Sequence, residues 1–516
     1  MAFERRSGIL LHPTSLPGDH GIGDIGREAY AWIDFLAAAG QRLWQVMPLG
    51  PTGYGDSPYQ CFSAFAGNPY LIDLGALRTA GWLEADELAS LAELPRGQVD
   101  FGAVIPLKLG LLGVAAERFA ASASAEQRAA LSDFAVRQAA WLDDYALFMA
   151  IKERQGGGAW VEWPAALRGR EAAELEHAAR ELAGAIERHK LWQHWFFAQW
   201  SALKAYANAK GVSVVGDVPI FVSMDSADAW SNPELYYFDA SGNPTVVAGV
   251  PPDYFSATGQ RWGNPLYRWE VMAARGFDWW VWRVRATLEL VDLLRIDHFR
   301  GFAAYWEIPA AEPTAVKGRW VEGPGQALFD ALRAALGELP VIAEDLGVIT
   351  PDVERLRDAN GLPGMKVLQF AFGGAAADPY LPHNYVKNCV VYSGTHDNDT
   401  TLGWYRGAPE RERDFARRYL ARGDDNLAWE FVRLAFASAA DLAIVPLQDV
   451  LGLGSAARMN TPGKAAGNWS WRFSWSEVPY WAAAQLREMA EVYGRLASGG
   501  PSDTAYRQSV LQDSPA

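Results

Sequence analysis

Cysteine is scarce in this sequence, which holds Cys61 and Cys389 among its 516 residues. Two cysteines are too few for a disulfide framework or for a metal site built on thiolates. They fit a reducing compartment, because structural disulfides form and persist in oxidising ones. We therefore expect a cytoplasmic protein.

Long apolar runs are missing as well. No stretch reaches the length of about 18 apolar residues that a membrane-spanning helix needs. After Arg5 and Arg6, the apolar segment 8–11 is shorter than the apolar region of a signal peptide. We expect neither a membrane span nor a secretory signal.

Basic residues are outnumbered by acidic ones. The chain has 46 lysines and arginines against 61 aspartates and glutamates, which gives a formal net charge of −15. An acidic protein repels phosphate backbones and anionic lipid surfaces. The sequence therefore argues against nucleic acid and membranes as partners, whereas a neutral ligand is not disfavoured.

Patterns that bind metals or cofactors are also lacking. The eight histidines show no metal-ligand spacing. A calcium loop could begin at Asp397, but Leu402 and Ala408 stand where that loop requires glycine and glutamate. The segment 452–457 loosely matches a dinucleotide fingerprint, yet no acid follows at the required distance. We expect no metal and no cofactor.

Aromatic residues, by contrast, are abundant, with 23 tryptophans, 19 tyrosines and 23 phenylalanines. We expect most of them to pack in the core. Tryptophan and tyrosine also offer a flat apolar face with a polar tip. This combination suits the C–H faces and hydroxyl edges of sugar rings, so the composition is compatible with a carbohydrate ligand.

Short apolar segments recur along the chain, and helical patterns such as residues 27–39 and 352–360 lie between them. Continuous apolar runs of this length are typical of parallel strands buried on both faces. The alternation predicts an α/β protein, a TIM (β/α)8 barrel with inserted, mainly helical subdomains. The eight expected strands are residues 8–12, 43–47, 212–218, 293–297, 340–345, 365–370, 389–394 and 442–446.

The spacing of these strands is uneven and predicts two insertions in a single catalytic domain spanning residues 1–516. Residues 67–205, between the second and third strands, have amphipathic helical patterns. Residues 223–285, between the third and fourth strands, are rich in proline, glycine and tryptophan. Within them we expect no regular structure over 249–265, and long irregular loops are usually lids or binding loops. A rigid structural loop is the alternative.

Carboxylates follow several of the expected strands. Asp217 lies at the end of the third strand, Asp297 of the fourth and Glu344 of the fifth, and Asp397 follows the seventh. Catalytic groups of (β/α)8 enzymes sit at the carboxyl ends of the strands. A single acid there would indicate a helix cap or a loop hydrogen bond, but four at the same end favour a catalytic site.

The surroundings of these acids predict different protonation states. Arg295 and Asp297 are two residues apart and share one face of their strand. We expect the guanidinium to lower the pKa of Asp297 and keep it ionised. Glu344, among other carboxylates in a partly dry cleft, is expected to have a raised pKa and to act as a general acid. Two carboxyls whose pKa values are pushed apart are what glycoside cleavage uses.

The strand ends carry longer motifs that resemble those of a known family. Residues 216–219, 294–300, 343–347 and 396–398 resemble the four signature regions of the α-amylase clan. The details are closest to one branch, the 4-α-glucanotransferases called amylomaltases or disproportionating enzymes. Further similar stretches are residues 7–16, 55–59, 249–265, 459–463 and 467–469. The resemblance covers nearly the whole chain.

The resemblance implies roles for individual residues. The nucleophile of the family falls on Asp297, its acid/base on Glu344 and its third carboxylate on Asp397. Family positions that bind sugar, or that lie on the loop near the site, fall on Tyr59, Asp217, Gln260, Trp262, Arg295, His396 and Asn468.

The resemblance also implies an activity, the transfer of α-1,4-glucan segments by retaining double displacement through a covalent glucosyl–Asp297 intermediate. Retaining enzymes hold their two carboxyls about 5–5.5 Å apart. The expected partners are maltooligosaccharides, amylose or glycogen-derived glucans, with glucose as an acceptor. Two alternatives remain open, an α-glucan hydrolase with the same acids and a glucan-binding scaffold without catalysis.

Overall fold

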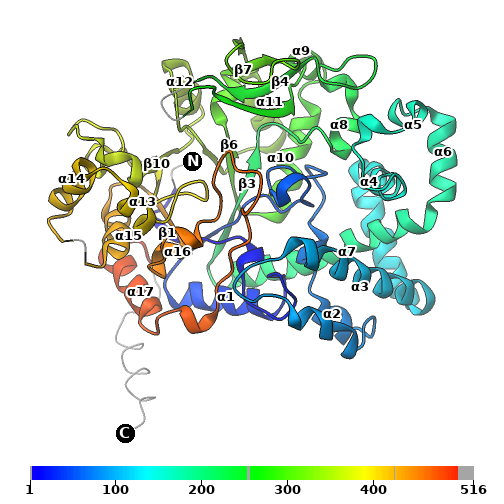
Figure 1. Ribbon diagram of the computed structural model, residues 1–516, viewed down its shortest axis with the longest axis horizontal. Helices are drawn as coiled ribbons and strands as arrows, with labels where there is room; N and C mark the ends of the chain where they lie inside the picture. Colours follow the sequence, from blue (N-terminus) through cyan, green and yellow to red (C-terminus); the bar gives the residue numbers. More distant parts are fainter. Residues whose placement is uncertain (1–2, 253–255, 424, 498–516) are drawn as a thin grey trace, which may run out of the picture.

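Eight parallel strands form the centre of the computed structural model, which describes residues 3–252, 256–423 and 425–497 (Figure 1). Their order in the sheet is β10-β11-β12-β1-β2-β3-β6-β9, and helices surround them. The predicted (β/α)8 barrel is thereby confirmed. The strands are β1 (Arg6–Leu10), β2 (Leu43–Gln45), β3 (Ser213–Pro219), β6 (Leu293–Asp297), β9 (Val341–Ala343), β10 (Gly364–Val367), β11 (Cys389–Tyr392) and β12 (Leu442–Pro446).

The apolar runs become strands because both of their faces are buried. Side chains such as Leu43, Val215 and Ile342 point into the barrel and form its interior cluster. Neighbours such as Val214 and Val341 pack outward against the helices. Alternation of this kind leaves no solvent-facing side, so the strands read as continuous apolar segments.

The helices form a ring around the strands and a larger group between β2 and β3. That group includes α2 to α7 and lies beside the barrel, blue to cyan in Figure 1. The helices are α1 (Arg27–Ala38), α2 (Leu74–Thr79), α3 (Phe101–Ser122), α4 (Ala125–Arg154), α5 (Ala165–Arg168), α6 (Ala172–Glu181), α7 (Ala183–Ala209), α8 (Ala227–Ser231), α9 (Trp269–Ala274), α10 (Asp278–Leu290), α11 (Gly325–Leu336), α12 (Pro351–Ala359), α13 (Thr401–Gly407), α14 (Glu410–Leu420), α15 (Leu427–Ala437), α16 (Leu447–Val450) and α17 (Ala482–Val492).

Helix α7 links this helical group to the barrel. Its Trp200 is buried and donates a hydrogen bond from the indole N–H to the Leu290 carbonyl at 2.7 Å, at the end of α10. Lys204 adds bonds to the carbonyls of Leu288 and Val291. The long helix therefore covers β3 and is fastened at the amino end of β6.

A second sheet stands on the carboxyl side of the barrel and corrects one prediction. Its antiparallel strands, in the order β5-β4-β7-β8, are β4 (Val246–Val250), β5 (Gln260–Pro265), β7 (Ala304–Pro309) and β8 (Arg319–Glu322). The expectation that 249–265 lacks regular structure is wrong at both ends of the segment. Residues 253–255 lie outside the described residues.

The prediction failed at β4 because a glycine lies inside that strand. A Cβ atom on Gly249 would lie 2.1 Å from the Gln260 carbonyl oxygen, so glycine is what lets β5 approach β4. The register between the two strands shifts at the same place. Glycine inside a strand marks such a close approach or bulge, and in the sequence it is easily taken for a break.

Within the described residues, no helix combines the length and the apolar character that crossing a membrane requires. Cys61 and Cys389 are both free thiols.

Candidate active site

The strand-end carboxylates gather at the carboxyl face of the barrel. The Arg295 guanidinium joins Asp217 on β3 to Asp297 on β6. The backbone N–H of His298 donates to the Glu344 carboxylate after β9 at 2.7 Å. Adjacent strands of a closed barrel bring their ends to one rim, and these contacts show that rim assembled from β3, β6 and β9.

Arg295 is the cation at the centre of the site. It is 4% exposed, and its Nη1 lies 2.7 Å from each oxygen of Asp217. Its Nη2 donates to Asp297 Oδ1 at 2.9 Å, as the two-residue spacing predicts. The Asp217 side chain is fully buried, whereas that of Asp297 is 32% exposed. The guanidinium thus holds one carboxylate in place behind the site and orients another toward the cleft.

The predicted lowering of the pKa of Asp297 is wrong. Burial raises that pKa, and although Arg295 opposes the shift, the negative charges of Asp217 and Asp397 add to it. The net direction is upward. One guanidinium shared between two carboxylates cannot offset burial together with two like charges.

The Glu344 carboxyl has the raised pKa that the sequence predicts. Burial and the nearby charge of Asp297 raise its pKa to about 8, against the opposing effects of Arg295 and of two backbone N–H donors. The donors are those of His298, at 2.7 Å from Oε2, and Leu346, at 2.9 Å from Oε1. At neutral pH Glu344 therefore carries a proton beside Asp297.

The backbone turns sharply to place the first of these donors. His298 has a φ of 57°, in the left-handed region that non-glycine residues seldom adopt. Strain of this kind persists where the surrounding structure fixes it, and it concentrates at functional sites. Here it directs the N–H that follows Asp297 back toward Glu344.

Asp397 is held as an anion. Burial alone would raise its pKa, but the His396 imidazole and the Asn460 amide outweigh burial and hold the pKa below its usual range. The Asn460 amide donates to Oδ1 at 2.6 Å, and His396 Nε2 lies 3.4 Å from Oδ2. The side chain is 47% exposed and so remains open to a ligand.

Asn460 is a residue of the site to which sequence reasoning gave no role. It lies within the stretch 459–463 that carries part of the family resemblance, and its proximity to Asp397 was the missing information. Its backbone N–H also donates to the His396 carbonyl at 3.1 Å. A loop after β12 therefore supports two candidate residues that follow β11.

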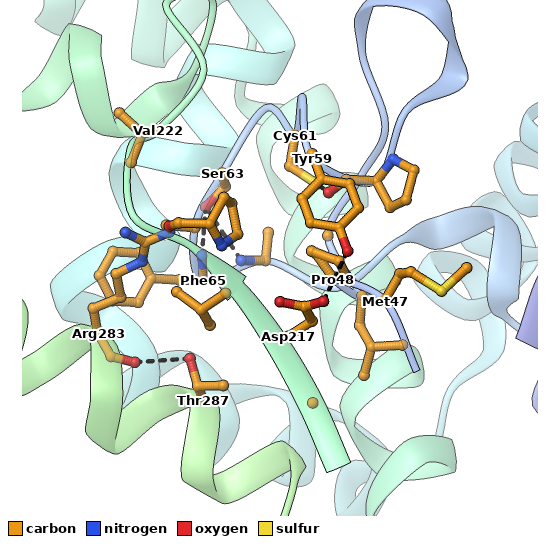
Figure 2. Close-up of a pocket in the computed structure, with 18 of the residues that line it drawn as sticks. Met47, Pro48, Tyr59, Cys61, Ser63, Phe65, Asp217, Val222, Arg283 and Thr287 are labelled. Atoms are coloured by element: carbon orange, nitrogen blue, oxygen red, sulfur yellow. Dashed lines mark hydrogen bonds between the residues drawn. The ribbon is translucent and has the colours of Figure 1, made fainter. Parts of the chain in front are cut away.

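An aromatic wall borders the carboxylates. The Tyr59 hydroxyl donates to Asp217 Oδ2 at 2.7 Å, and Figure 2 shows the phenol pointing at that carboxylate. The Tyr59 ring stacks on His396 with centroids 5.1 Å apart, and Trp469 lies 5.8 Å from Tyr59. Burial raises the pKa of Tyr59 well above its ordinary value, which keeps the hydroxyl a donor.

Strand β5 brings Gln260 and Trp262 to the same rim. The Trp262 indole N–H donates to Gln260 Oε1 at 3.1 Å. Its ring meets His298 edge to face, with centroids 4.8 Å apart and an interplanar angle of 88°. Gln260 is exposed and Trp262 partly so. Trp262 therefore lies against the backbone turn at His298, which follows Asp297, and Gln260 lies beside Trp262.

Asn468 is the candidate that the structure does not join to the others. Its Oδ1 accepts the Thr461 N–H at 2.9 Å, and its Nδ2 donates to the Lys464 carbonyl at 2.8 Å. These bonds close the loop that carries Asn460. Direct contact of Asn468 with a sugar stays a prediction.

A small cavity lies behind Tyr59 and Asp217, on the side toward α10 (Figure 2). It measures about 70 Å³, and its lining is largely apolar, with Arg283 among the polar residues. Since one water needs about 10–15 Å³ by this measure, the cavity has room for a few waters. Asp217 lines this cavity, and the other three candidate acids are not among its lining residues.

One cluster in the described part of the chain has the geometry of a metal site. His20, Asp24 and Asp73 offer ligand atoms within 4.8 Å of one another. The buried Lys108 ammonium lies 3.5 Å from Asp24 Oδ2 and already supplies a positive charge. The arrangement therefore suits a buried ion pair.

Fold and site together indicate a (β/α)8-barrel enzyme with a cluster of carboxyls at the carboxyl ends of its strands, where enzymes of this fold have their catalytic groups. A family model described as 4-alpha-glucanotransferase matches residues 11–477. The chain belongs to that family, which confirms the resemblance drawn from the motifs and shows a transferase acting on α-glucans.

Individual relatives agree over nearly the full length. The 4-alpha-glucanotransferase of Thermus thermophilus is 55% identical over 504 residues, covering 96% of this chain and 100% of the relative. That of Synechocystis is 48% identical and covers 96% of this chain and 99% of the relative. A solved structure, the amylomaltase from Streptococcus agalactiae in complex with acarbose, has a TM-score of 0.92 at 40% identity, covering 96% of this chain and all of the other.

Proposed function

We propose that this chain moves α-1,4-glucan segments between maltooligosaccharides, or from them to glucose, by a retaining double displacement. The observation that carries the proposal is the pair of Glu344 and Asp297. Burial and the Asp297 charge raise the pKa of Glu344 to about 8, so the glutamate is a proton donor at neutral pH. Asp297, oriented by Arg295, is the nucleophile.

In the first displacement, a carboxylate oxygen of Asp297 attacks the anomeric carbon of the donor glucan. The bond from that carbon to the glycosidic oxygen breaks, and Glu344 transfers its proton to the departing oxygen. The shortened glucan leaves with a free 4-hydroxyl. The remaining sugar is bound to Asp297 as a β-ester, formed through an oxocarbenium-like transition state.

The second displacement reverses these steps with another sugar. The 4-hydroxyl of an acceptor attacks the anomeric carbon while Glu344, now a carboxylate, takes its proton. The bond to Asp297 breaks and the aspartate is free again. Two inversions restore the α-configuration, and Glu344 regains its proton. We expect the two carboxyls to lie about 5–5.5 Å apart, as this course requires.

The other candidate residues are proposed to bind the sugar at the cleavage point. Ionised Asp397 accepts hydrogen bonds from ring hydroxyls and favours ring distortion. His396 donates, and the aromatic wall that includes Tyr59 packs against a sugar face. Gln260, Trp262 and Asn468 are proposed further contacts, and Asp217 together with Arg295 fixes the positions of Tyr59 and Asp297.

The choice of transfer over hydrolysis depends on the acceptor. A sugar held beside the ester has a high effective concentration relative to water. The edge of the second sheet that carries Trp262 lies beside the turn at His298, where it can cover a bound acceptor. Donors and acceptors are proposed to be maltooligosaccharides, amylose or glycogen-derived glucans. The proposed location is the cytoplasm.

Incubation of the purified protein with maltotriose tests the proposal. Transfer gives glucose together with longer maltooligosaccharides and few new reducing ends. Glucose and maltose alone, with steadily rising reducing ends, would instead identify a hydrolase. Asp297→Asn is the matched variant, because it removes the nucleophile and leaves the shape. It should lose nearly all turnover and still bind glucan, and unchanged turnover would contradict the assignment.

A further inference from the structure

Asp345 lies next to Glu344, and the proposed chemistry does not use it. In strand β9 the Ile342 side chain points into the barrel, whereas Val341 and Ala343 face the outer helices. Alternation along the strand then places Glu344 on the inner side and Asp345 on the outer side. The Asp345 side chain is 5% exposed. Burying a carboxylate is costly unless it is paired and hydrogen-bonded.

The partners of Asp345 lie on two other elements. Its Oδ1 accepts the backbone N–H of Met365 in β10 at 2.6 Å, and its Oδ2 accepts from Arg357 on α12 at 2.5 Å. Strands β9 and β10 are the two ends of the eight-stranded sheet, and no strand ladder joins them in the described residues. One backbone bond, from the Ala343 N–H to the Pro363 carbonyl at 2.9 Å, crosses between them. The Asp345 carboxylate supplies a further link across this seam.

Gly364 makes the close approach possible. A Cβ atom at this position would lie 2.4 Å from Asp345 Oδ2. A side chain at 364 would therefore push the carboxylate away from β10. Gly364 leaves the space that the Asp345 carboxylate needs, and the carboxylate then links β9 to β10 at this seam.

The link between Asp345 and β10 also affects the position of Glu344, the proposed acid. The residue after Asp345 is Leu346, whose N–H donates to Glu344 Oε1 at 2.9 Å. On the other side of the seam, the Met365 sulfur accepts from Arg295 Nε at 3.4 Å. Fixing Asp345 therefore fixes a donor to Glu344 and a neighbour of the central guanidinium.

We infer that Asp345 is a positioning residue for the reaction: by closing the barrel between β9 and β10 it holds the backbone that directs the Glu344 carboxyl at the glycosidic oxygen. This inference rests on the proposed role of Glu344. Asp345 itself touches no substrate.

Asp292 offers a matched control at the opposite end of the barrel. Its Oδ2 accepts the Val214 N–H of β3 at 2.7 Å, and its Oδ1 lies 3.6 Å from the Lys204 ammonium. Asp292→Ala and Asp345→Ala each remove one carboxylate link to a neighbouring strand and one cation partner. We expect both variants to lose thermal stability.

The two variants differ in the expected effect on turnover. Misplacing a catalytic group by about 1 Å can cost about 100-fold in rate, so Asp345→Ala should lower kcat by about 10–100-fold with KM nearly unchanged. Asp292→Ala should keep the kcat of the folded protein. An equal loss of kcat in both variants would show that Asp345 serves stability alone and would overturn the inference.

The dependence of kcat on pH gives a second test of the inference. Loss of a residue that only stabilises the fold should leave the pH profile of the folded enzyme unchanged. The titratable groups that interact with the charge of Glu344 are Asp297, Arg295 and Tyr380, and the two backbone N–H groups donate hydrogen bonds to it. A loosened seam admits water and relieves the burial that raises the pKa of Glu344, and because burial has the largest effect on this pKa, its relief outweighs the loss of the Leu346 donor, which acts in the opposite direction. The basic limb of kcat should therefore move to lower pH in Asp345→Ala.

Asp345→Asn keeps the test decisive if the alanine variant does not fold. It retains an acceptor for the Met365 N–H and loses the charge that pairs with Arg357, so kcat should fall less and the basic limb should still shift. An unchanged kcat and profile would overturn the inference. Glu344→Gln separates this failure from that of the proposed function. If Glu344→Gln retains turnover, the proposed function fails, whereas an inactive Glu344→Gln beside a normal Asp345→Asn refutes only the role of Asp345.

Discussion

The Asp297→Asn variant measures how strongly one carboxylate acts on the other, because it removes a charge without changing the shape. In the native protein the Asp297 charge contributes, after burial, to the Glu344 pKa of about 8. Two unit charges about 5 Å apart interact by about 3 kcal/mol at an effective dielectric constant of about 20. This energy corresponds to about 2 pKa units. The pKa of Glu344 should therefore fall to about 6 in the variant.

The assay is a carbon NMR titration of protein labelled at the glutamate carboxyl carbons. Glu344→Gln identifies the Glu344 resonance by its loss, and Asp292→Asn, at the amino end of β6, serves as a charge control that should leave the resonance unchanged. A fall of less than about half a unit would refute the reasoning, since it would mean that burial alone sets the pKa or that the carboxyls lie well beyond the separation of a retaining pair.

Three further predictions concern single side chains. Glu344→Gln should raise the melting temperature above pH 8 and have little effect near pH 4. The folded-state pKa of Glu344, about 8, lies above the ordinary 4.5, so the stability of the native protein falls as pH rises between those values. Equal shifts of the melting temperature at both pH values would contradict this. Asn460→Ala should raise the pKa of Asp397 and lower kcat on maltotriose by about 10-fold, since a hydrogen bond to a charged group contributes about 1.5–3 kcal/mol; unchanged initial rates would refute it. Ser124→Ala removes the capping box of α4 and should cost about 1 kcal/mol in urea unfolding with kcat unchanged.

The strands and their acids could be predicted because the signal is local. A parallel strand buried on both faces needs apolar residues throughout, so β6 and β12 were expected over the residues where they are found. The turn to polar residues marks the strand end, and that end locates Asp297. The parity of Arg295 and Asp297 follows from strand geometry and reappears as their 2.9 Å contact.

What could not be predicted depends on residues distant in the chain. The pKa of Asp297 rises because the charges of Asp217 on β3 and of Asp397 after β11 add to the effect of burial, and the local sequence shows only Arg295. The contact of Asn460 with Asp397 needs the loop after β12 to fold over β11. Strand β4 was missed because Gly249, the residue that permits its pairing, carries no strand signal of its own.

The second sheet draws its strands from two different connections of the barrel. Strands β4 and β5 belong to the connection between β3 and β6, while β7 and β8 belong to the connection between β6 and β9, and β4 pairs directly with β7. The segment that carries Trp262 and the segment that follows Asp297 therefore pair within one sheet. Deleting either connection would leave a strand of the other without its pairing partner, so we expect a deletion in one connection to disturb the other as well.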